Sequence, residues 1–78
     1  MSNDVVSRVV KVASAIFNLP PDEITVALAY NSHERWDSIA QMNLILALEE
    51  EFNVQFLDDE IEDMLTIDLI INIISSRP

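Results

Sequence analysis

The first eighteen residues carry apolar side chains at helical spacing. Two neighbouring rows together form a broad apolar face: Val5, Val9, Val12 and Ile16 in one row, and Val6, Val10, Ala13 and Phe17 in the other. Such spacing is typical of an amphipathic helix that packs one side on a core. We predict a helix over residues 4–18, with Asn3 or Asp4 as its N-cap and Pro20-Pro21 preventing its continuation.

The next helical period begins only at residue 38. Residues 19–37 have no sustained period, so we predict a long loop that is attached to the core by its apolar side chains: Ile24, Leu28, Tyr30 and Trp36. Loops of this length are uncommon unless they are functional or contain short helical turns. Residues 38–52 form the second predicted helix, in which Leu44, Leu48 and Phe52 share one face and are the best core candidates.

The last third of the chain predicts one short and one longer helix. The acidic segment DDEIEDM, residues 58–64, can bury one side of a turn or two through Ile61, Met64 and Leu65. The following run TIDLIINIIS alternates like a strand but also fits a helix with Ile67, Ile70, Ile71 and Ile74 on one face. Because an isolated strand would have no partner and Thr66 is a good N-cap, we predict a helix. The fold class is therefore all-α, a small bundle of three longer helices and one short helix in a single domain, residues 1–78.

Composition and charge narrow the function. The 78 residues include no Cys, which excludes disulfides and thiol nucleophiles, and no Gly, which excludes Gly-rich phosphate loops and EF-hand loops. Fourteen acids face four bases, and ten of the acids lie from Asp37 onward with a single base, Arg77. Nucleic acid and anionic membranes are thereby excluded as ligands, and a basic protein surface is the natural complement. With no leader or membrane-spanning run in the sequence, we expect a cytoplasmic monomer.

The second helix has a further apolar row that starts at a serine. Ser38, Met42 and Leu46 lie on a different side from the core row, and this row continues towards Glu49 and Glu50. If the core row is buried, Met42 and Leu46 are at least partly exposed, and an apolar strip rimmed by charge is typical of a docking surface. An Asp-Ser at the start of a helix is in most proteins only a cap. The exposed strip distinguishes this serine from a simple cap.

At these positions the sequence resembles the acyl carrier protein family, including its peptidyl-carrier relatives. That family has Asp-Ser-Leu or a close variant, followed by a hydrophobic helix that ends in Leu-Glu-Glu-x-Phe; the corresponding residues here are Asp37-Ser38-Ile39 and Leu48-Glu49-Glu50-Glu51-Phe52. An acidic short helix and a Thr-led final helix are matched by DDEIED and Thr66. The resemblance covers nearly the whole chain and is strongest over residues 36–76.

The resemblance implies that Ser38 carries 4′-phosphopantetheine, transferred from coenzyme A by a separate magnesium-dependent phosphopantetheinyl transferase. The thiol of this arm would hold an acyl group as a thioester, which explains how a chain without Cys could handle acyl groups. Asp37 would cap the helix and help to present Ser38 or its metal ion to the transferase. The other expected partners are acyl-loading and acyl-transferring enzymes with basic docking surfaces, and we assign the partner surface to Met42, Leu46, Glu49, Glu50 and Glu60.

The sequence departs from the family pattern at several positions. Arg35-Trp36 precedes Asp37 where many members have Gly-x, and Ala40 and Asn43 stand where fatty-acid-synthesis carriers are often acidic. We therefore expect a carrier for a specialised fatty-acid, polyketide or related pathway. In the family the acyl chain can slip between the helices, and the Ile-rich last helix allows either this or simple tight packing.

Two other functions are weighed against the carrier. An enzyme is disfavoured because the chain has a single histidine, His33, so that a nucleophile with a base and an orienting group cannot be assembled. The alternative is an unmodified acidic helical adaptor that binds a basic partner through the strip of Met42 and Leu46. Composition allows this adaptor, but it leaves the serine on the strip unexplained.

Overall fold

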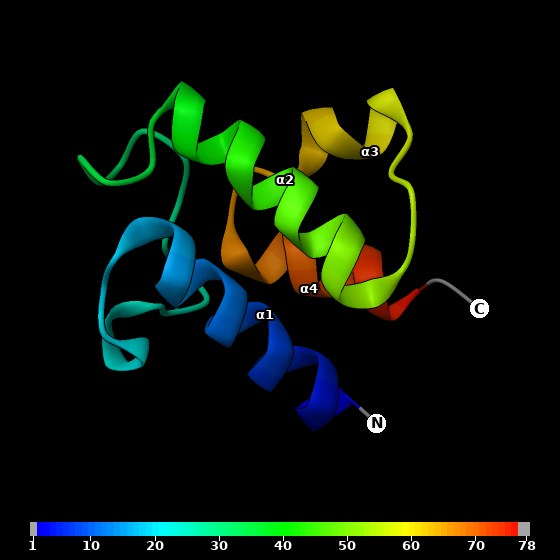
Figure 1. Ribbon diagram of the computed structural model, residues 1–78, viewed down its shortest axis with the longest axis horizontal. Coiled ribbons are helices and arrows are strands. Elements are labelled where there is room, and N and C mark those ends of the chain that lie inside the picture. The colour runs from blue at the N-terminus through cyan, green and yellow to red at the C-terminus, as the bar shows by residue number, and fades with distance from the viewer. Residues whose placement is uncertain (1, 77–78) are drawn as a thin grey trace.

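The computed structural model describes residues 2–76 of the chain, and the side chains of residues 4–76. Its elements are α1 (Ser2–Phe17), the 3-10 helix η1 (Pro21–Glu23), α2 (Ser38–Phe52), α3 (Asp58–Asp63) and α4 (Ile67–Ser75). Figure 1 shows α1 and α2 side by side, and α1 packs on both α2 and α4, while α3 contacts α4. The all-α prediction is confirmed, including the long loop between the first two helices.

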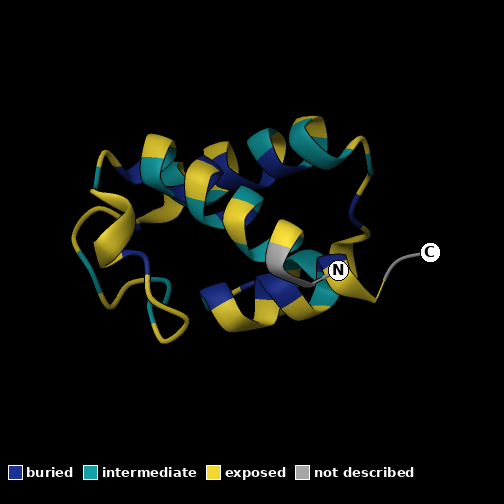
Figure 2. Cartoon of the chain, turned by 90° about the horizontal axis from the view of Figure 1, so that it is seen from below, coloured by how far each residue is buried: buried dark blue, intermediate teal, exposed yellow. Residues whose placement is uncertain are grey.

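The core is built from the faces that the helical periods predict. No polar or charged side chain among the described residues is buried, and Figure 2 shows buried segments on the long helices and within the loop. The buried residues from the predicted sets are Val9, Val12, Ala13, Phe17, Ile24, Trp36, Leu44, Leu48, Met64, Ile67, Ile70, Ile71 and Ile74. The burial of four isoleucines on one side of α4 confirms the helix over the strand, and Thr66 caps α4 by accepting a hydrogen bond from the Leu69 amide.

Three details of the prediction are wrong. Because α1 begins at Ser2, Asn3 and Asp4 lie inside its first turn rather than at its N-cap, and Asp4 there pairs with Arg8 one turn later at 3.6 Å. Phe52 is only half-buried, and the guanidinium of Arg8 lies 4.3 Å from the centre of its ring. Leu65 is 42% exposed, since this residue contributes its backbone to the fold rather than its side chain.

Asparagine performs the turns in this chain that glycine usually performs. Among the described residues, those with positive φ are Asn18, Asn31 and Asn53, at 55°, 66° and 54°. Asn18 directly follows α1, and Asn53 is the C-cap of α2. Asparagine is one of the few residues besides glycine that enters the left-handed region at modest cost, because its short polar side chain can bond locally. The chain can therefore end two helices sharply without a glycine.

The loop between α1 and α2 is held against the start of α4. Ala29 forms an isolated antiparallel bridge with Thr66, and the Tyr30 amide donates to the Leu65 carbonyl at 2.8 Å. The amide of Ile67, in the first turn of α4, donates in return to a loop carbonyl at 3.0 Å. The loop thus satisfies backbone groups at the start of α4 and fixes the course of the chain towards residue 38.

Trp36 is the main apolar contact of the loop. Its side chain is fully buried, and its ring lies 4.9 Å from that of Phe17, measured between ring centres. This confirms the prediction that Trp36 attaches the loop to the core. The corner of the chain just before α2 is therefore fixed by the core.

Candidate functional site

Ser38 is the first residue of α2 and is exposed. The residue before it, Asp37, is the N-cap, and its carboxylate accepts a hydrogen bond from the Ala40 amide at 2.9 Å. The Asp-Ser pair therefore has the geometry of a cap, as predicted for Asp37. The serine hydroxyl lies at the end of the helix that carries the positive partial charge, where a negatively charged substituent is favoured.

A tyrosine hydroxyl lies next to this serine. The Tyr30 hydroxyl and the Ser38 Oγ are 2.8 Å apart, within hydrogen-bond distance. We did not predict this contact from the sequence. Tyr30 lies eight residues upstream in a loop without a period, so no spacing rule connects it to Ser38.

The exposed apolar strip continues from the serine along α2. Met42 and Leu46 are 67% and 61% exposed, which confirms the exposure that we predicted for both residues. Ile39 is 71% exposed and belongs to the same strip, because positions 39, 42 and 46 follow helical spacing. We did not predict Ile39 as part of this strip, although the same helical spacing includes it. We call these three residues the α2 strip.

A shallow groove borders the α2 strip on the side of α3. It has a volume of about 280 Å³ and is lined by Gln41, Met42, Ile45, Leu46, Glu49 and Ile61. Most of these side chains are apolar, and two belong to the α2 strip. The groove can therefore accept an apolar group of modest size, and its lining begins about one helical turn along α2 from Ser38.

The three acids assigned to the partner surface differ in their surroundings. Glu50 is exposed. Glu49 and Glu60 are half-buried, and each carboxylate accepts a backbone hydrogen bond at 2.9 Å, from the Phe56 and Leu57 amides respectively. Glu49 and Glu60 thus hold turns of the fold with one oxygen each, whereas Glu50 is the acid in this set with the greatest exposure.

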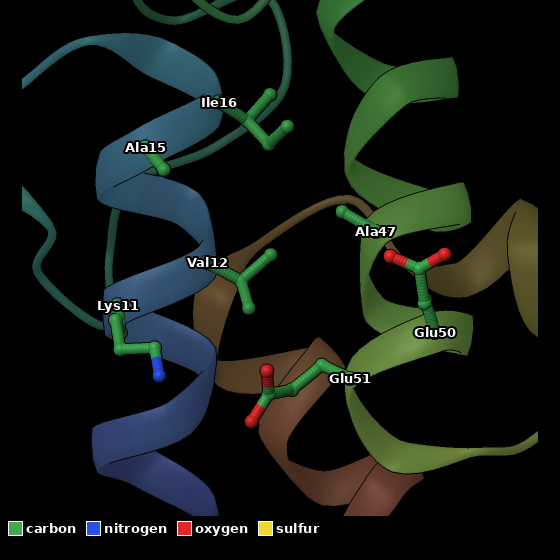
Figure 3. A pocket seen from close by; sticks show the side chains of 7 residues that line it. All are labelled: Lys11, Val12, Ala15, Ile16, Ala47, Glu50 and Glu51. Atoms are coloured by element: carbon green, nitrogen blue, oxygen red, sulfur yellow. The ribbon is translucent and has the colours of Figure 1, made fainter.

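A second groove, of about 360 Å³, lies between α1 and α2. Figure 3 shows Lys11 on the α1 side and Glu50 and Glu51 on the α2 side, around an apolar floor. Glu51 accepts a hydrogen bond from Arg8 Nε at 2.8 Å, and this bond holds the pKa of Glu51 below its ordinary value. A carboxylate that remains ionised in this way is poorly suited to donate a proton near neutral pH.

No group of three or more His, Cys, Asp or Glu side chains in the described part of the chain could hold a metal ion. Among the helices that the structure describes, none has the length and apolar character needed to cross a membrane.

Comparison with known proteins found relatives that are named acyl carrier proteins. No protein-family model matches the chain. The chain is 29% identical over 76 residues to the mitochondrial acyl carrier protein 2 of Arabidopsis thaliana, covering 97% of the chain and 60% of that protein. It is 28% identical over 75 residues to the acyl carrier protein of Buchnera aphidicola subsp. Schizaphis graminum, covering 96% of the chain and 95% of that protein. The chain thus spans less than two thirds of the plant relative and nearly all of the bacterial one.

Proposed function

Because the chain belongs to the acyl carrier protein family, we propose that it carries acyl groups as thioesters on a 4′-phosphopantetheine arm attached to Ser38. The choice of Ser38 as the attachment site rests on one observation. Ser38 is exposed at the first position of α2, directly beside the α2 strip. In this proposal the protein is a carrier and not an enzyme. It acts as the substrate of a phosphopantetheinyl transferase.

The surroundings of Ser38 fit a phosphodiester. The start of a fifteen-residue helix favours negative charge, and Asp37 already fixes the first turn by accepting from Ala40. In the modification, the Ser38 hydroxyl would take the phosphopantetheinyl group from coenzyme A, losing its proton and releasing adenosine 3′,5′-bisphosphate. When bound, the arm supplies the thiol that the chain lacks. Ser38 would hold it, and Asp37 would help to present Ser38 or its metal ion to the transferase.

The α2 strip and the acids around it would form the docking surface. The exposed apolar side chains would contact the partner directly. The basic residues of the partner would face the acids assigned to this surface, which are Glu49, Glu50 and Glu60. Exposed charge pairs contribute about 0–1 kcal/mol each, so that docking is transient and weakens with salt. Weak docking suits a carrier that must leave each partner, namely the transferase and the acyl-loading and acyl-transferring enzymes.

The pathway is part of the proposal. Ala40 and Asn43 lie in the first turns of α2, and Asn43 is exposed at a position where an acid would extend the charged surface towards Ser38. We therefore favour a specialised fatty-acid, polyketide or related pathway. We propose the cytoplasm as its compartment, although one of the two relatives is a mitochondrial protein by name.

Intact-mass measurement tests the attachment site. The purified protein is incubated with coenzyme A, Mg²⁺ and a broad-specificity phosphopantetheinyl transferase. We expect one added phosphopantetheine, which is absent in Ser38→Ala and retained in Ser7→Ala, a control at an exposed serine of α1. Modification that persists in Ser38→Ala would refute the site. A folded protein that no tested transferase modifies would favour the second candidate, an unmodified acidic adaptor, for which the exposed α2 strip is also suited.

The groove between α2 and α3 supports a further element of the proposal, the position of the acyl chain. Its apolar lining at Ile45, Leu46 and Ile61 would shelter the methylenes nearest the thioester from water. Each sheltered methylene stabilises the folded protein by about 0.8 kcal/mol, so the melting temperature should rise with chain length until the groove is full. Melting curves of protein loaded with acyl groups of increasing length measure this. A constant melting temperature would show that the acyl chain remains in solvent and that the helices simply pack tightly.

A further inference from the structure

We propose that Tyr30 is a positioning residue for Ser38, holding its hydroxyl before modification and bonding the phosphodiester afterwards. The contact that suggests this is the hydrogen bond of 2.8 Å between the two hydroxyl groups. This inference rests on the proposed function, because it assigns a task to Tyr30 only if Ser38 is the residue that is modified.

The position of Tyr30 is fixed independently of Ser38. Its amide donates to the Leu65 carbonyl at 2.8 Å, and its side chain is half-buried and packs on the core. On its other side, the Asn31 amide donates to the Trp36 carbonyl at 3.0 Å, which closes the loop onto the corner before α2. The backbone on both sides of Tyr30 is therefore fixed, so a held loop presents the phenol to Ser38.

The chemistry of the two hydroxyl groups sets the direction of the bond. A phenol has a far more acidic proton than an aliphatic alcohol, so Tyr30 is the better donor and Ser38 Oγ the better acceptor. The proton of Ser38 is then left pointing away from the tyrosine, where a base on the transferase can remove it. The same bond restricts the rotation of the serine side chain and holds Oγ in one position for attack.

Modification would strengthen the contact. Once Ser38 Oγ is an ester oxygen it has no proton, and a phosphate group with anionic oxygens is attached to it directly. The Tyr30 hydroxyl can then donate to a charged acceptor, and such bonds are roughly twice as strong as bonds between neutral groups. Tyr30 would thereby also limit the directions in which the arm leaves the helix.

The first test compares modification rates. Tyr30→Phe removes the hydroxyl and keeps the ring, so we expect kcat for the transferase to fall about threefold to tenfold, the range for one neutral hydrogen bond. KM should stay nearly constant, because the α2 strip is unchanged. The matched control is Ser32→Ala, since Ser32 bonds the backbone of Ala29 in the same loop and has no contact with Ser38 in the structure. It should be modified at the wild-type rate.

The second test reports on the bond itself. The modified protein contains one phosphodiester and one tyrosine, so its 31P signal and the 13Cζ signal of Tyr30 can each be assigned without ambiguity. We expect the 31P shift to differ between the modified wild type and modified Tyr30→Phe, and the 13Cζ shift to change when the wild type is modified.

Each outcome decides one of the two proposals. If the wild type is modified but Tyr30→Phe keeps the wild-type kcat and 31P shift, the positioning role is refuted and the carrier function stands. An equal loss of rate in Ser32→Ala would also refute it, because the cause would then be a loosened loop. If the folded wild type is not modified at all, the carrier function fails, and the role of Tyr30 fails with it.

Discussion

Gln41 joins two segments that are far apart in the chain, and its replacement tests how the start of α2 is held. Its side-chain oxygen accepts a hydrogen bond from the Trp36 indole at 2.5 Å, and its side-chain nitrogen donates to the Met64 carbonyl at 2.9 Å. Trp36 and Met64 are both fully buried. The amide therefore connects the loop before Ser38 to the end of α3, using a donor and an acceptor at once.

The expected cost of Gln41→Leu follows from these two bonds. Leucine has a similar size but leaves a buried indole N–H and a backbone carbonyl without their partner. A buried polar group left unpaired costs about 1–3 kcal/mol, so we expect a loss of about 2–6 kcal/mol for the two groups. A domain of this length is stable by about 4–12 kcal/mol in total. The melting temperature should therefore fall by at least about 8 °C.

Urea unfolding followed by fluorescence measures this loss. Trp36 is the only tryptophan in the chain and is fully buried, so its emission reports unfolding directly. Asn43→Leu is the control, because Asn43 is exposed on the same helix and its replacement should change stability by less than about 0.5 kcal/mol. If Gln41→Leu is as stable as this control, the two bonds do not hold the structure together.

Gln41→Glu tests the bond to Met64 separately from the bond to Trp36. The carboxylate can still accept from the Trp36 indole, but it has no hydrogen to give to Met64 and faces the carbonyl with negative charge. Protonation restores an O–H donor, so the folded state raises the pKa of the new carboxyl group. The deficit of Gln41→Glu relative to wild type should be full at neutral pH and shrink as the pH falls through that raised value. A deficit that is the same at every pH would exclude the bond to Met64 as its cause.

Three other predictions concern surface and cap positions. Arg8 lowers the pKa of Glu51, so the stabilisation by this pair is present above the ordinary carboxyl pKa and is lost as the pH falls through the lowered value. The melting temperatures of wild type and Glu51→Gln should therefore differ at pH 7 and converge in acid. Asn53→Ala should cost about 1 kcal/mol in urea unfolding because φ is 54° there, and a cost as large for Asn53→Gly would contradict the reasoning. Thr66→Ala removes the acceptor of the Leu69 amide and should cost about 1 kcal/mol in the same assay, whereas Thr66→Ser should be close to neutral.

The helices and most of the core could be predicted because they depend on local spacing. The face that α4 buries follows from the positions of its isoleucines, and the cap at Thr66 follows from its residue type and place. The two-sided character of α2 was also visible in the sequence: one row is buried at Leu44 and Leu48, and another is exposed at Met42 and Leu46. In each case the period of the helix alone determines which residues share a face.

The contacts around Ser38 could not be predicted in the same way. Tyr30 reaches Ser38, and Gln41 reaches Met64, only because the loop folds back along the start of α4. That path depends on backbone bonds between residues 35 to 42 positions apart, and no local pattern encodes them. The error at Leu65 has the same origin, because the loop uses its carbonyl and leaves its side chain outside the core.

The two apolar sides of α2 divide its large side chains into a set that builds the core and a set that is exposed. A helix that only filled the core would have polar residues at positions 39, 42 and 46, and the core row would be equally well buried without the α2 strip. The α2 strip therefore contributes little to folding, yet it keeps three large apolar side chains in water beside the exposed serine. Under the proposed function, partner enzymes would cover this strip. Its position next to Ser38 means that any protein bound there would also have the serine within reach.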